Sequence, residues 1–146
     1  MSLFAVDAED RANQLIHLTE RLTARLAEET RAFENHRPQD AAPGVTETAR
    51  LANIYRHEAA RVKLKPEMVA GAALETRRRL LRATEAFEAV LARHGRAVNA
   101  ARLISEGLVR AIAEEVAKTR SRGAGYGPAA RVAPSNASAI AVNRRA

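Results

Sequence analysis

The histidines are the side chains in this chain best suited to metal binding or proton transfer. A carboxylate-bridged di-iron bundle places a glutamate three residues before a histidine on two of its helices. The residues three positions before His17, His36, His57 and His94 are Gln14, Phe33, Ile54 and Leu91. That site is therefore absent. The chain also has no cysteine, which excludes thiolate zinc sites, iron–sulfur clusters and cysteine nucleophiles.

Other motifs with a known chemistry are missing too. The sequence contains no HExxH, no GxSxG and no Gly-Lys-Ser/Thr phosphate loop. The run Gly123-Ala124-Gly125-Tyr126-Gly127 superficially resembles a dinucleotide-binding turn, but it follows an expected helix instead of a strand. We expect His94 to be a partly buried residue with a hydrogen-bond partner; the alternative is a ligand or proton carrier. We therefore predict a protein that is not an enzyme, with no catalytic residue, metal or cofactor.

The composition is that of one helical domain. The chain has 146 residues, 47% of them hydrophobic and 28% charged, and its 33 Ala stand against only 7 Gly and 5 Pro. Trp is absent and Phe and Tyr are few, so the core must be aliphatic. No apolar run approaches the 18 or so residues of a membrane span, and the first residues lack a basic stretch. We expect a cytoplasmic protein without membrane insertion.

Local signals divide the chain into three helices and a tail. The first helix is predicted at about 8–35 with Asp7 as its N-cap, followed by a loop at 36–44. The second spans about 46–64 and breaks at Lys65, before Pro66. The third runs from about 67 to 122, with Gly123 as its C′ residue. The predicted fold is all-α: an antiparallel three-helix bundle at 1–122 with one very long third helix, and a flexible basic tail at 123–146.

Each predicted helix carries an apolar face. On the first helix this face holds Leu15, Leu18, Leu22, Leu26 and Phe33, and on the second Leu51, Ile54, Tyr55 and Val62. The third has a seven-residue seam made of Leu80, Thr84, Phe87, Leu91, His94, Val98, Ala101, Ser105, Leu108 and Ile112. At ~1.5 Å per residue the third helix would be about 75 Å long, against about 42 Å and 28 Å for the others. This geometry permits part of the seam to stay uncovered.

Charge is distributed unevenly. Residues 1–60 hold 7 basic and 10 acidic residues, whereas residues 61–146 hold 17 basic and 7 acidic. The sharpest basic feature is the group Arg77, Arg78, Arg79 and Arg82, which could contact phosphates or an acidic partner. The alternative, which we favour, is a solvated surface whose arginines pair with Glu75, Glu85 or the acidic first helix.

One segment resembles a known family. The run from Glu106 to Ala117, EGLVRAIAEEVA, continuing to Gly125-Tyr126-Gly127, is similar to alphaproteobacterial flagellar proteins of the FlgN type, which are type III export chaperones. The resemblance covers most of residues 46–127. It implies an antiparallel helical bundle that binds hook–filament junction (hook-associated) proteins in the cytoplasm before export. It implies client binding at Ile104, Leu108, Ile112 and Val116, and docking on the flagellar export gate through Tyr126.

Two alternatives remain open beside the chaperone. The first is a small basic nucleic-acid-associated protein that uses the arginines at 77–82; we do not expect nucleic acid as the partner, because stacking aromatics are scarce. The second is a self-associating coiled coil. The oligomeric state we expect is a monomer or a weak dimer.

Overall fold

The structure, a computed structural model, describes residues 3–124, and between these limits all of its regular secondary structure is helical. Its elements are α1 (Ala8–Glu34), the 3-10 helix η1 (Pro38–Gly44), α2 (Val45–Leu64), α3 (Glu67–Ala70) and α4 (Leu74–Ala124). The predicted all-α fold with a long final helix is confirmed. The chain divides into two compact units, Met1–Leu103 and Ile104–Ala146, and each is described by itself. The predicted tail beyond Ala124 lies outside the described residues.

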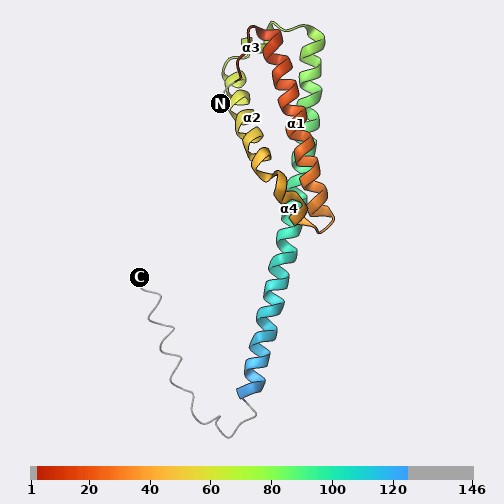
Figure 1. Cartoon of the computed structure of the whole chain (residues 1–146), viewed down its shortest axis with the longest axis vertical. Coiled ribbons are helices and arrows are strands. Elements are labelled where there is room, and N and C mark those ends of the chain that lie inside the picture. Colours follow the sequence, from red (N-terminus) through yellow and green to blue (C-terminus); the bar gives the residue numbers. More distant parts are fainter. Residues whose placement is uncertain (1–2, 125–146) are drawn as a thin grey trace, which may run out of the picture. The chain divides into compact units, whose positions relative to one another are not determined.

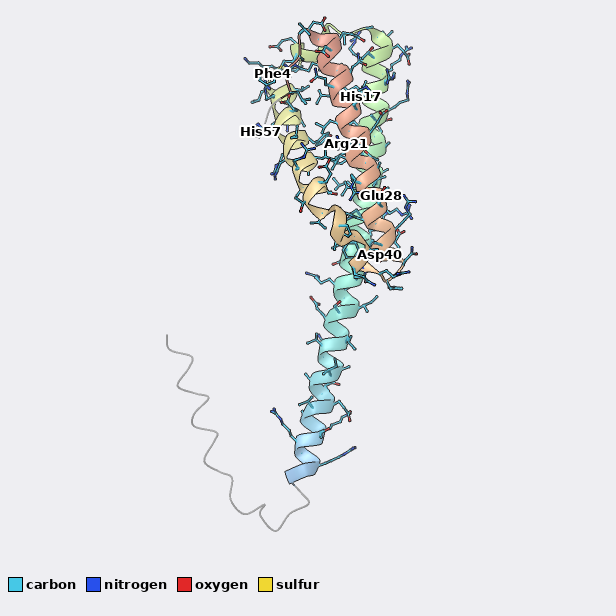
Figure 2. The ribbon with its side chains drawn as sticks, in the orientation of Figure 1. Phe4, His17, Arg21, Glu28, Asp40 and His57 are labelled. Atoms are coloured by element: carbon cyan, nitrogen blue, oxygen red, sulfur yellow. The ribbon has the colours of Figure 1, made fainter. Side chains whose placement is uncertain are left out.

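In the first unit, α1, α2 and the first part of α4 lie side by side (Figure 1). The chain reverses direction between consecutive long helices, so α1 and α4 run parallel. Two contacts show this: the start of α1 meets the start of α4 through Glu9 and Ala73, and the end of α1 meets Arg93 through Glu34. The short η1 occupies the predicted loop between α1 and α2, and Figure 2 shows Asp40 at that end of α1.

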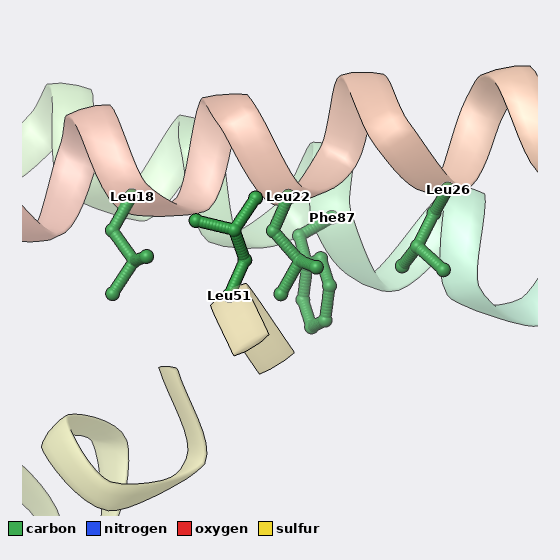
Figure 3. Close-up of a cluster of buried hydrophobic side chains, with 5 residues drawn as sticks. All are labelled: Leu18, Leu22, Leu26, Leu51 and Phe87. Atoms are coloured by element: carbon green, nitrogen blue, oxygen red, sulfur yellow. The ribbon is translucent and has the colours of Figure 1, made fainter. Parts of the chain in front are cut away.

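The core forms where the predicted apolar faces meet. Leu18, Leu22 and Leu26 extend from the same side of α1 toward Leu51 of α2 and Phe87 of α4 (Figure 3). The ring of Tyr55 packs on that of Phe87 with centroids 4.7 Å apart. Burying a side chain of this size contributes about 1.5–3 kcal/mol. This cluster of leucines around Phe87 therefore accounts for much of the packing among the three helices.

The predicted seam of α4 consists of two lines of residues. One line packs as predicted, and the other is displaced by one position. Within the first unit, Leu80, Phe87, His94 and Ala101 are buried or half-buried, as the seven-residue period predicts. The second line of contacts runs through Val90 and Ala97 instead of Leu91 and Val98, which remain 46% and 36% exposed. Val90 packs against the core cluster, whereas Leu91 lines an open groove. The reason is that α1 and α2 cover α4 from one side only.

The start of α4 also differs from the prediction. The expected single helix from residue 67 is interrupted, since α3 ends at Ala70 and α4 begins only at Leu74. The carboxylate of Glu9 on α1 accepts hydrogen bonds from the backbone N–H of Ala73, at 2.7 Å, and from the hydroxyl of Thr76. A side chain from another helix therefore caps α4. At its other end, α4 continues through the predicted stop at Gly123 to Ala124.

Glu58 is a buried carboxylate that joins three segments. Its side chain is 0% exposed, and it accepts hydrogen bonds from the backbone N–H of Leu3 (3.0 Å), Arg11 of α1 (3.2 Å) and Arg61 of α2 (3.1 Å). The segment before α1 thus runs beside the end of α2, as Phe4 and His57 show in Figure 2. Charges this deeply buried are tolerated only when they are paired in this way.

We expect Glu58→Ala to destabilise the protein by about 3–5 kcal/mol, because Arg11 would keep a buried charge without its partner. Urea unfolding followed by circular dichroism measures this change. Glu75→Ala is the matched control, since Glu75 pairs with Arg82 on the surface at 2.9 Å and surface pairs contribute little. A Glu58→Ala midpoint equal to that of the control would contradict the role assigned to the buried pair.

The stability of the fold should fall in acid. Hydrogen bonds from Thr76 and then from Ala73 lower the pKa of Glu9 below its ordinary value of 4.5, and the hydrogen bond from Arg93 lowers the pKa of Glu34 in the same direction. A carboxyl with a lower pKa when folded adds stability that is present above its unfolded pKa and is lost as pH falls through the folded one. We expect the urea midpoint to drop below about pH 4.5, and to drop less steeply in Glu9→Gln.

Candidate partner-binding surface

The four residues implied as client-binding form one line along α4. Ile104, Leu108, Ile112 and Val116 follow one another at four-residue spacing, so each lies one turn beyond the last on the same side of the helix. They are 56%, 60%, 55% and 46% exposed, respectively. Every residue from Arg102 to Gly123 is exposed. These four residues are called the apolar stripe below, and the structure leaves the stripe uncovered.

The opposite side of the same stretch carries charges of alternating sign. These residues also follow one another at four-residue spacing, and we call them the charge ladder: Arg102, Glu106, Arg110, Glu114 and Lys118. Opposite charges four residues apart stabilise a helix by about 0.2–0.5 kcal/mol per pair. The two sides of this stretch therefore differ in character: charges of both signs lie on one side and exposed apolar side chains on the other. The alternation of charge sign at four-residue spacing is visible in the sequence alone.

The arginine cluster lies on the first turns of α4. Arg77, Arg78, Arg79 and Arg82 are all exposed, and Arg78 and Arg82 share a face. The guanidinium of Arg82 pairs with Glu75 at 2.9 Å. The positive charge of Arg79 contributes, after the hydrogen bonds from Thr76, Ala73 and Asn13, to lowering the pKa of Glu9. Part of the cluster therefore acts within the chain, as the alternative interpretation of these arginines predicts.

His94 has the structural role expected for it. It is half-buried, its Nδ1 lies 3.2 Å from the hydroxyl of Thr30, and its ring meets Phe33 edge-on at 6.1 Å. The Thr30 hydroxyl donates its own hydrogen to the carbonyl of Leu26 at 2.6 Å. The oxygen of Thr30 must therefore accept from His94, which places a hydrogen on Nδ1. This bond helps to hold α4 against α1.

An apolar groove lies between the helices of the first unit, and the sequence did not reveal it. Its volume is about 490 Å³, and its lining is Leu22, Leu26, Ala49, Ala52, Asn53, Tyr55, Arg56, Phe87 and Leu91. Burial and the nearby charge of Glu88 raise the pKa of Tyr55 above its ordinary value, so the phenol stays neutral. Grooves of this kind depend on how three helices diverge, and a pattern along one helix does not show that.

Two further findings concern only the described residues. Between residues 3 and 124, no group of three histidine or carboxylate side chains is arranged to hold a metal ion. No helix in this range combines the length and apolar character needed to cross a membrane. Tyr126, expected to dock on the export gate, lies outside the described residues.

Comparison with known proteins gives one full-length relative. The chain is 54% identical over 149 residues to the flagellar basal-body protein FlbY of Caulobacter vibrioides, and the alignment covers 100% of both chains. No protein-family model matches the chain, so the resemblance to FlgN-type chaperones has no support of that kind. No solved structure matches the chain at a significant level.

We expect no saturable binding of the protein to duplex DNA or RNA at about 0.15 M salt, and any binding at lower salt to weaken steeply as salt rises. The reason is that Arg82 is already paired and few aromatic side chains are present to stack on bases. Fluorescence anisotropy with labelled oligonucleotides measures this. Tight binding at 0.15 M salt that disappears when the whole arginine cluster is changed to alanine would refute the expectation.

Proposed function

This chain belongs to the family of the flagellar basal-body protein FlbY, and we propose that it serves flagellar assembly as a type III export chaperone. In this proposal the protein acts in the cytoplasm without enzymatic activity or cofactor. It binds an amphipathic terminal helix of hook–filament junction proteins. Binding keeps these clients monomeric and competent for export.

The observation that supports the proposal is the exposure of the apolar stripe. Ile104, Leu108, Ile112 and Val116 each leave about half of their surface to water, all on one side of a helix. A contiguous exposed apolar surface usually marks a site for a partner. A helix with an apolar face of its own is the natural complement, since its side chains can pack at i, i+4 spacing against the stripe.

The physical basis of the activity is burial of two apolar surfaces at once. A junction protein's amphipathic terminal helix exposes an apolar face before assembly, and that face would otherwise associate with other copies. The stripe covers that face and gains the same hydrophobic free energy from its own burial. Tyr126, beyond the end of α4, is then the residue we assign to docking on the export gate.

We expect Leu108→Ala with Ile112→Ala to weaken client binding about 100-fold or more, because two large side chains leave the centre of the contact. The measurement is fluorescence anisotropy with a labelled peptide spanning the terminal helix of a hook–filament junction protein from the same bacterium. Helix content should stay that of the wild type, since both side chains are more than half exposed.

The matched control is Leu81→Ala with Leu103→Ala, which removes two α4 leucines of similar exposure outside the stripe. This variant should bind the peptide as the wild type does. Equal binding by the stripe variant and the wild type would show that the client site lies elsewhere. Failure of the wild type to bind any junction-protein helix would overturn the proposed function itself.

A further inference from the structure

The described chain contains two unpartnered apolar features of complementary form: the groove of the first unit and the stripe on residues 104–116. We propose that the groove of one copy binds the apolar stripe of a second copy, so that the protein associates with itself through two different surfaces. The two surfaces occur in every molecule in equal number. The proposal goes beyond the chaperone function and holds whether or not the stripe also takes a client.

The groove has the size and lining to receive side chains of a helix. Its volume of about 490 Å³ lies within the range of about 300–1,000 Å³ typical of binding clefts. Leu22, Phe87 and the half-buried Tyr55 line it, and the 46% exposed Leu91 belongs to the same surface. Ala49 and Ala52 of α2 add no bulk, so a helix can approach α2 closely. Apolar side chains at i, i+4 spacing, such as Leu108 and Ile112, suit this surface.

One charge on each feature favours a second copy over an unrelated helix. Glu115 comes three residues after Ile112 and three before Lys118, so its side chain borders the stripe, between the stripe and the charge ladder. Among residues 3–124 it forms no ion pair. A partner that buries this carboxylate together with the stripe would have to supply a cation for it, because burying a lone carboxylate is costly.

Arg56 is the matching cation in the groove. It lines the groove from α2 and donates a hydrogen bond of 2.5 Å to the side-chain oxygen of Asn53. In the part of the chain that the structure describes, no carboxylate pairs with it. An apolar groove with an unpaired base and an apolar stripe with an unpaired acid are therefore complementary in both shape and charge. The ion pair Arg56–Glu115 between copies satisfies both.

The first experiment is sedimentation of the full chain over a range of concentrations, with one variant for each surface. Ala49→Lys fills the groove at an exposed position, and Leu108→Ala with Ile112→Ala removes the stripe. Each should raise the dissociation constant of self-association about tenfold or more. Ala60→Lys, at an exposed α2 position outside the groove lining, is the matched control and should behave as the wild type does.

An equimolar mixture of the two variants should regain association, because the groove variant still carries a stripe and the stripe variant still carries a groove. In the same way, Arg56→Glu and Glu115→Arg should each weaken association, and the double charge swap should restore it. Wild-type protein that stays monomeric at all concentrations would overturn the proposal. So would undiminished association of Ala49→Lys, which would indicate that two stripes pair with each other.

These outcomes are separable from those that bear on the chaperone. Ala49→Lys should bind the junction-protein peptide as the wild type does, because its stripe is intact. The stripe variant should lose both activities. If the peptide and the second copy use the same stripe, the peptide should dissociate the self-associated wild type in proportion to the fraction of stripes that the peptide occupies. Association that persists at saturating peptide would overturn the assignment of the stripe as the second copy's contact.

Discussion

The buried carboxylate of Glu58 is the constraint on which the first unit depends. It has no access to water, so it must be met by the guanidinium groups of Arg11 and Arg61 and by the N–H of Leu3. Those partners come from the segment before α1, from α1 and from α2. Any arrangement of the helices that separated them would leave a buried charge unpaired. The hydrophobic cluster supplies the driving force for packing, and Glu58 selects which packing is allowed.

A second set of polar contacts fixes α4 on α1 along its length. Glu9 caps the start of α4 through Ala73 and Thr76, and Thr30 meets His94 about two and a half helical turns before the first unit ends at Leu103. The ion pair of Glu34 and Arg93 closes the end of α1 with two hydrogen bonds of 2.7 and 2.6 Å. These contacts join residues about 60 positions apart in the sequence. They set the register of α4, which apolar contacts alone would leave free to slide.

The sequence predicted local features well and distant ones poorly. The helix bounds at 8–35 and 46–64 agree with α1 and α2 to within a residue, and Asp7 caps α1 by accepting from the N–H of Asp10 at 2.8 Å. Caps and proline breaks act within a few residues, so they are visible in the sequence. The interruption before Leu74 was missed, and the side chain that caps α4 there, Glu9, lies 64 residues away from Ala73. The groove and the burial of Glu58, which also depend on segments far apart in the sequence, were missed too. The four stripe residues were named from the family resemblance, and only Leu108 and Ile112 also belong to the predicted seam; the structure adds that all four side chains are exposed.

The helical state of the segment that carries the charge ladder has a consequence for how a client helix would bind to it. Since the segment after Leu103 is already helical, in the proposed complex it would not have to fold on binding, and the entropic penalty of ordering would fall on the client helix alone. The binding surface would then have the same helical structure before the client binds and after the client dissociates. Attraction between the alternating charges of the ladder acts through water, where dissolved salt screens it. Salt therefore weakens the charge interactions of this helix more than it weakens the apolar contact with the client in the proposed complex.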